Sequence, residues 1–338
     1  MDSRLVQAPS VSTGTLQGDG MTPVPFGAKS AIGRLMPNIG DFVFKNLTRL
    51  FAIMVFSLVF LMAFEMYRGS RLTIDKFGWS FLTTSTWDPV QGVFGALPFI
   101  WGTVVSSLLA LAIALPLSLG VAVFLSELVP RWLEGPLSFM IELLAAIPSI
   151  VYGLWGVFVM VPWLRITVEP FLAKRFGYLP FFTGAPYGFG MLAAGLILAV
   201  MVLPIITSIS RDILKAIPNL QREAAFALGA TRWEVTKIIL QGAKSGILGA
   251  TLLGLGRAIG ETMAVTMVIG NRSDISASLF NPAYSMASVL ANEFAEATTD
   301  MYTNALIEVA LLLFGVTIVL NGLARMIVWG MTRKYKTP

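Results

Sequence analysis

The stretch GFGMLAAGLILAVMVLPIITSI occupies residues 188–209 and contains no charged side chain. A helix of about 20 apolar residues crosses the hydrocarbon core of a bilayer, because each residue adds about 1.5 Å of length. Pro204 lies inside the stretch, and an internal proline is tolerated in a membrane helix when neighbouring helices satisfy the freed backbone groups. The stretch therefore predicts a membrane-spanning helix that packs against other helices.

Five further apolar stretches of similar length lie on either side of it. The six predicted spans cover residues 47–66, 99–125, 141–161, 188–209, 246–270 and 305–330. The chain of 338 residues is 56% hydrophobic and only 13% charged, whereas a soluble domain carries about a quarter charged residues. The predicted fold is an all-α polytopic membrane protein with six transmembrane helices.

The composition also limits the chemistry of the chain. It has no Cys and no His, so disulfides, Cys or His metal ligands, Cys nucleophiles and the Ser-His-Asp arrangement are excluded. Residues 1–45 are rich in Gly, Pro, Ser and Thr and show no apolar period. They predict a disordered leader ahead of the first span.

Lys and Arg are distributed unevenly between the two sets of loops. With the N-terminus placed inside, fifteen of the 24 basic residues fall in inner segments and seven in outer loops. Because cytoplasmic loops of membrane proteins carry an excess of Lys and Arg, both termini are predicted to be cytoplasmic. We attribute the net charge of +5 to these loops and predict no binding of nucleic acid.

The usual nucleotide-binding loops are absent from the sequence. No G-x-x-x-x-G-K-[ST] motif occurs, and GLGRAIG at 254–260 departs from the dinucleotide-binding spacing G-x-G-x-x-G by one residue. We expect no cofactor on this chain and no covalent catalysis. If ATP energises a process in which this chain takes part, another subunit must supply it.

The inner loop between the fourth and fifth predicted spans reads IPNLQREAAFALGATRWE over 217–234. Asn219 is the predicted N-cap of a helix that ends at Gly229, and Thr231 with Glu234 forms a capping box for the next helix. The loop therefore predicts two short helices with apolar side chains outside the bilayer. Such a unit suits either an amphipathic segment on the lipid surface or a helix docked in a groove of a cytoplasmic partner.

Two ionisable residues lie inside the fifth predicted span. Arg257 is near its middle, and Glu261 follows four residues later on the same helical face. A charged side chain there costs roughly 2.5–3.5 kcal/mol on insertion scales, and such residues usually mark substrate or ion pathways. The pair is either an ion pair that neutralises itself for insertion or part of an aqueous path where the guanidinium meets an oxyanion. We favour the pathway interpretation.

The inner loop resembles the E-A-A-x-x-x-G signature of the inner-membrane permease subunits of ABC importers. The matching residues are Glu223, Ala224, Ala225 and Gly229. The pattern of that family continues with I-x-L-P, where this chain has Ile239 but carries Gln241 and Gly242 in place of the Leu and Pro. In the family this segment docks on the ATP-hydrolysing subunit, so the resemblance implies coupling helices near residues 217–240.

Three longer stretches resemble the C-type permeases of the phosphate-specific branch of this family. They read GLGRAIGETMAVTMVIGN at 254–271, ELLAAIPSIVYG at 142–153 and ASVLANEFAEA at 287–297. The resemblance implies a type I ABC importer permease in a bacterial inner membrane. It further implies a heterodimer with an A-type permease, a dimer of ATPase subunits and a periplasmic phosphate-binding protein. It also implies that Arg257 and Glu261 act in phosphate passage.

With this resemblance, the chain is predicted to contain four parts. These are a leader over 1–45, a first transmembrane helix with an outer loop over 46–98, an ABC permease domain over 99–332 and a cytoplasmic tail over 333–338. Two alternatives stay open at this point. One is a permease for another oxyanion, such as molybdate or sulfate, and the other is a transporter driven by an ion gradient.

Overall fold

A computed structural model of the chain describes residues 39–333, and within that range it contains helices and loops but no strand. Six helical runs are long and apolar enough to cross a membrane, which confirms the predicted number of spans. They are Gly40–Gly69, Leu97–Leu128, Ser149–Phe176, Met191–Lys215, Arg232–Ile259 and Asp300–Gly330.

The helices are connected by short turns and by longer loops, of which the longest joins α12 to α13. The α-helices are α1 (Ile39–Gly69), α2 (Arg71–Phe77), α3 (Ser80–Thr83), α4 (Leu97–Val123), α5 (Arg131–Ala146), α6 (Ser149–Trp155), α7 (Val161–Trp163), α8 (Glu169–Phe176), α9 (Met191–Lys215), α10 (Asn219–Ala227), α11 (Arg232–Ile259), α12 (Met263–Val268), α13 (Met286–Glu293) and α14 (Asp300–Arg333). The other helical turns are the π-helical η2 (Phe124–Leu128), η3 (Gly156–Met160) and η4 (Leu164–Val168) and the 3₁₀ turn η5 (Pro180–Phe182).

The chain forms two compact units, residues 1–59 and 60–338, with the boundary inside α1. The described residues of the first unit all belong to α1, which begins at Ile39. Helix α1 thus begins inside the leader predicted over 1–45. Apolar residues such as Phe42 and Phe44 extend the apolar sequence of the first span towards the N-terminus. The remainder of the predicted leader, 1–38, lies outside the described residues.

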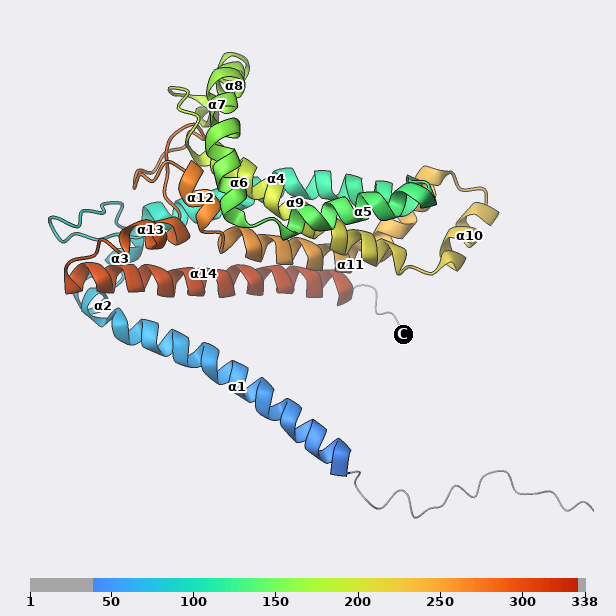
Figure 1. Cartoon of the computed structure of the whole chain (residues 1–338), viewed down its shortest axis with the longest axis horizontal. Coiled ribbons are helices and arrows are strands. Elements are labelled where there is room, and N and C mark those ends of the chain that lie inside the picture. Colours follow the sequence, from blue (N-terminus) through green and yellow to red (C-terminus); the bar gives the residue numbers. More distant parts are fainter. Residues whose placement is uncertain (1–38, 334–338) are drawn as a thin grey trace, which may run out of the picture. The chain divides into compact units, whose positions relative to one another are not determined.

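Helices α4 and α9 pack together along their length at the centre of the second unit (Figure 1). Gly195 of α9 lies against Leu109 of α4, where an added Cβ would come within 2.5 Å of the Leu109 side chain. Small residues at such an interface let two helices approach closely, which is how helices associate in a bilayer. Beside Pro204, Ser118 of α4 donates a hydrogen bond of 3.1 Å to the carbonyl of Leu203. Close packing and polar contacts therefore join the two central helices.

The third predicted span is divided in the structure. Helix α5 ends just before Pro148, and α6 begins just after it. Proline lacks the N–H that would continue the helix and disfavours helical backbone at the preceding residue, and Ile147 has an extended ψ of 129°. The candidate span is the run Ser149–Phe176, so the predicted bounds 141–161 are wrong.

The fifth predicted span also has different bounds in the structure. Helix α11 begins at Arg232 and continues for 28 residues to Ile259, and α12 begins only at Met263. The bounds 246–270 are therefore wrong, and the second of the two predicted short helices is instead the first part of this long helix. Gly242 stands where the resembled family has a proline, and a glycine lets the helix continue where a proline would interrupt it.

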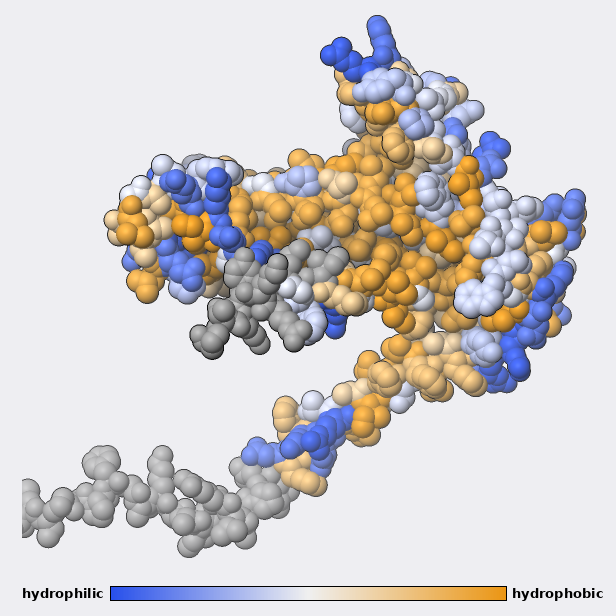
Figure 2. All heavy atoms as spheres, turned by 180° about the vertical axis from the view of Figure 1, so that it is seen from behind, coloured by the Kyte–Doolittle hydropathy of each residue, from blue (hydrophilic) through white to orange (hydrophobic). Residues whose placement is uncertain are grey.

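Short helices lie at the two ends of the second unit. At one end, α2, α3 and α13 lie around a buried cluster (Figure 1). Its aromatic members are Phe81, Phe94, Phe99, Tyr284 and Tyr302. Helix α10 lies at the opposite end. Figure 2 shows apolar residues over the middle of this unit and hydrophilic residues gathered towards its ends, the distribution expected of a bilayer-spanning protein.

A substitution at Gly102 of α4 tests the packing at the first of these ends. An added Cβ would lie 2.0 Å from the carbonyl oxygen of Tyr284 and 2.8 Å from its carbonyl carbon. Because backbone atoms cannot turn aside as a side chain does, Gly102→Ala is expected to destabilise the protein by about 1–3 kcal/mol and to lower its melting temperature. Gly120→Ala, in the same helix but in open space, is the control. Equal melting temperatures for the two variants would contradict this packing.

Candidate functional site

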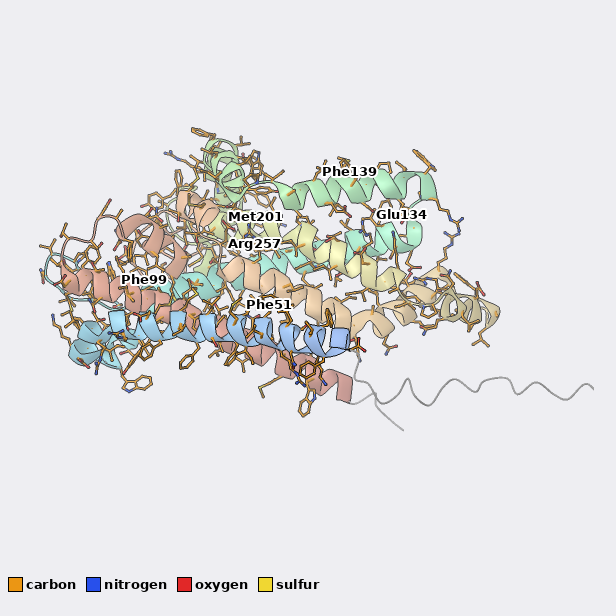
Figure 3. All side chains as sticks on the ribbon, turned by 60° about the horizontal axis from the view of Figure 1, so that its bottom comes forward. Phe51, Phe99, Glu134, Phe139, Met201 and Arg257 are labelled. Atoms are coloured by element: carbon orange, nitrogen blue, oxygen red, sulfur yellow. The ribbon has the colours of Figure 1, made fainter. Side chains whose placement is uncertain are left out.

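Arg257 and Glu261 meet where α11 ends. Arg257 lies in the last turn of α11, and Figure 3 shows it about midway along the second unit. Its Nη2 lies 3.1 Å from Oε2 of Glu261. Glu261 is in the break between α11 and α12, so the predicted pair forms, but across a helix end and not on one continuous helical face.

The two partners of this ion pair have different surroundings. The side chain of Glu261 is only 3% exposed, whereas that of Arg257 is 48% exposed. Glu261 Oε1 also accepts a hydrogen bond of 3.3 Å from the N–H of Ala264, at the start of α12. The carboxylate is therefore held in place by two groups. Because a guanidinium has five N–H donors, the half-exposed Arg257 retains donors that can bind an oxyanion.

An open groove of about 580 Å³ lies between α11 and α14. Its lining residues are Gly249, Leu252, Leu253, Asn321, Arg325, Val328 and Trp329. A Cβ added to Gly256 would lie 4.0 Å from Oδ1 of Asn321, so this amide is near the turn of α11 that carries Arg257. Asn321 was not predictable from the sequence, because no motif links a single amide in the sixth span to the fifth.

Helix α10 places the residues of the E-A-A-x-x-x-G motif in different environments. Ala225 is 6% exposed and belongs to a buried cluster that includes Leu214 of α9 and Ile239 of α11. Glu223 and Ala224 are exposed. Ala225 therefore attaches α10 to the bundle, while its two neighbours face away and are accessible to a partner.

Gly229 ends α10 in the left-handed region, with φ of 83°. Its N–H donates to the carbonyl of Phe226 at 2.9 Å, and the N–H of Ala230 donates to the carbonyl of Ala225 at 3.1 Å. These two bonds form a Schellman motif, which requires a residue with positive φ and so favours glycine. The predicted role of Gly229 as a helix terminator is confirmed.

Of the two other helix caps predicted in this segment, one is confirmed and one is wrong. The capping box is confirmed, because the Thr231 side chain accepts from the Glu234 N–H while the Thr231 N–H donates to the Glu234 carboxylate. The predicted N-cap Asn219 is wrong. Pro218 holds that position, and Asn219 is the first helical residue.

This segment exposes several large apolar side chains. They are Leu220 (74%), Phe226 (50%), Leu228 (90%) and Trp233 (64%). Large apolar side chains that gather outside the core mark an interaction surface. Helix α11 begins beside this surface at Arg232 and carries Arg257 25 residues later, about 38 Å away at 1.5 Å per residue. One continuous helix therefore connects this surface to the Arg257–Glu261 pair.

The acidic and aromatic residues at the other end of the unit serve its internal structure. Glu293 accepts hydrogen bonds from Trp87 Nε1 at 2.7 Å and from Tyr302 Oη at 2.8 Å. Burial raises the pKa of Tyr284 to about 12, so this phenol stays protonated even at a pH at which a free tyrosine ionises. Within residues 39–333, no group of three or more Asp or Glu side chains is arranged to hold a metal ion.

Comparison with solved structures gives the fold. The structure described as "Inward facing conformations of the MetNI methionine ABC transporter: CY5 native crystal form" superposes with a TM-score of 0.54. The match covers 72% of this chain and 99% of that one, at 19% sequence identity. The chain therefore has the fold of a chain of this ABC transporter.

Comparison with sequences gives the family. Residues 114–333 match the family described as "Binding-protein-dependent transport system inner membrane component". A Phosphate transport system permease protein PstC from Mesorhizobium japonicum is 46% identical over 290 residues, which cover 84% of this chain and 89% of the relative. Its counterpart from Pasteurella multocida is 45% identical over 306 residues, covering 89% and 95%. The chain belongs to this family of transport permeases and is a multi-pass protein of the inner membrane.

Proposed function

We propose that this chain is the membrane-spanning permease subunit of an ATP-driven phosphate importer. The observation that carries the proposal is the half-exposed Arg257 beside the buried Glu261, in a chain 46% identical to a protein named as a phosphate permease. A guanidinium matches the geometry of a tetrahedral oxyanion. Glu261 competes with the passing anion for the same guanidinium, so phosphate is released and not retained.

We infer that the working complex contains a second, A-type permease, a dimer of ATPase subunits and a periplasmic phosphate-binding protein. The exposed apolar side chains of α10 and its neighbouring turn supply a docking surface for an ATPase subunit. ATP and Mg²⁺ bind to those partner subunits, and this chain carries no cofactor and no catalytic residue. The excess of Lys and Arg in the inner loops supports an orientation with both termini and α10 in the cytoplasm.

In this proposal, ATP binding moves the ATPase subunits together and displaces α10. The long helix α11 carries that displacement to its last turn, where the backbone break before α12 allows Arg257 to change its position relative to α12. The path between the two permeases then opens alternately to the outside and to the inside. Phosphate is delivered by the binding protein and contacts Arg257 as it crosses.

Uptake of labelled phosphate tests this function in cells that lack their own phosphate permease and carry this chain with its partners. Uptake is expected to be blocked by vanadate and by excess unlabelled phosphate, but not by sulfate or molybdate. Competition by sulfate or molybdate would still be consistent with an ATP-driven importer, but it would indicate that the transported anion is not phosphate. Uptake that survives vanadate but collapses with a protonophore would contradict ATP-driven transport and support an ion-gradient mechanism.

A further inference from the structure

Arg222, the fourth residue of α10, makes five hydrogen bonds at the junction of three elements. Its Nε and Nη2 donate to the two carboxylate oxygens of Glu127 at 3.3 and 2.8 Å. Nη1 donates to the carbonyl of Ile217 at 2.7 Å, and Nη2 donates to that of Leu214 at 2.9 Å. Nη1 also donates to Asn219 Oδ1 at 3.3 Å.

Four of these five bonds go to acceptors in the two central helices or in the turns that follow them, whereas the fifth acceptor, Asn219, belongs to α10 itself. Glu127 lies in η2, the π-helical continuation of α4, and turns of this kind recur at functional sites. Leu214 lies in the last turn of α9, where the last carbonyls have no partner within the helix, and Ile217 lies in the turn between α9 and α10. One guanidinium therefore joins α10 to both α4 and α9.

The Arg222–Glu127 ion pair is largely buried. The two side chains are only 16% and 13% exposed. A forked arginine–carboxylate contact fixes both distance and orientation, and its shielding from water makes its separation costly. The one buried residue of α10, Ala225, supplies an apolar contact without such directionality. Arg222 is therefore the directional attachment of α10 to the bundle.

We propose that Arg222 is a positioning residue that makes α4 and α9 follow the movement of α10. ATP-driven displacement would then reach the bundle by two routes, through the continuous helix α11 and through this guanidinium. The inference rests on the function proposed above and adds a residue outside the E-A-A-x-x-x-G signature to its coupling machinery. The competing explanation is that Arg222 only stabilises the end of α9.

Transport per ATP hydrolysed separates these two explanations. The complete complex, with the wild-type chain or with Arg222→Met, is reconstituted in proteoliposomes, and phosphate transport and ATP hydrolysis are measured together. Arg222→Met is expected to lower the number of phosphate ions moved per ATP by about tenfold, because hydrolysis continues while α4 and α9 no longer follow α10. The number of phosphate ions moved per ATP by Arg222→Lys is expected to lie between the wild-type and Arg222→Met values. A lysine ammonium keeps the positive charge but cannot form the forked contact with Glu127.

Lys215→Met is the matched control. Lys215 pairs with Glu134 and so joins α9 to α5 at the same end of the bundle, without a contact to α10. This variant is expected to keep the wild-type ratio. A wild-type ratio in Arg222→Met, or an equal loss in Lys215→Met, would overturn the inference.

Two milder variants answer the question if the Arg222→Met complex does not assemble. Arg222→Lys and Glu127→Gln preserve most of the side-chain volume, and a wild-type ratio in both would also overturn the inference. A wild-type complex that moves no phosphate with ATP would contradict the proposed function itself, together with the role of Arg222. The two failures are therefore distinguishable by the behaviour of the wild-type complex.

Discussion

Replacing Arg257 by Gln is expected to reduce phosphate uptake by about 100-fold or more while the complex still assembles. Charge-assisted hydrogen bonds contribute up to about 3 kcal/mol each, and Gln offers one neutral amide in place of a guanidinium. Assembly should persist, because Arg257 is 48% exposed and the buried Glu261 retains the N–H of Ala264 as a donor. Uptake of labelled phosphate and co-purification of the partner chains are the two measurements.

Arg68→Gln is the control for this prediction. Arg68 and Glu65 of α1 also form an Arg–Glu ion pair, with Nη1 3.3 Å from Oε1. Unlike the Arg257–Glu261 pair, both of its side chains are more than half exposed. Exposed pairs of this kind contribute about 0–1 kcal/mol, so uptake should remain at the wild-type level. Wild-type uptake by Arg257→Gln would reduce the Arg257–Glu261 pair to a structural role.

Replacing Gly229 by Val is expected to lower ATP-driven uptake by about tenfold or more. A β-branched residue does not tolerate a φ of 83°, and holding a non-glycine residue in this region costs about 1–3 kcal/mol. The Schellman turn would open, and the exposed side chains of α10 and of the turn after it would leave their docking positions. Co-purification of the ATPase subunits and transport per ATP would both fall.

Gly229→Asn is the matched control, because asparagine is among the residues that occupy left-handed positions. A Cβ at position 229 meets no atom within 4 Å, so the strain at this site comes from the backbone and not from a clash. The Asn variant should therefore retain most of the uptake. If Val and Asn gave the same result, or if Val left both docking and transport normal, the turn would not position α10.

The spans were predictable in number but not in their bounds, for a physical reason. Hydropathy identifies each segment that can lie in lipid, and it therefore located all six. It does not show where a helix breaks, because Pro148 ends one helix whereas Pro204 lies inside α9 without ending it. The difference depends on tertiary packing beside each proline. For the same reason the break between α11 and α12 was not predictable from a glycine-rich apolar sequence.

Local sequence patterns predicted the contact between Arg257 and Glu261, which are four residues apart, and the helix terminator Gly229, whose positive φ is a property of the local backbone. The Arg222–Glu127 pair was missed because its partners are 95 residues apart in sequence. Only the tertiary fold brings α10 and η2 close enough for this pair to form. Long-range pairs of this kind require a three-dimensional structure.

The most direct test of the account is accumulation of phosphate by the complete complex in proteoliposomes, measured with and without ATP and with the binding protein supplied outside. We predict accumulation that requires both ATP and the binding protein, that resists a protonophore, and that is lost in the Arg257→Gln complex. Accumulation without ATP, or accumulation at the wild-type rate by Arg257→Gln, would contradict a path in which ATP-driven movement carries phosphate past Arg257.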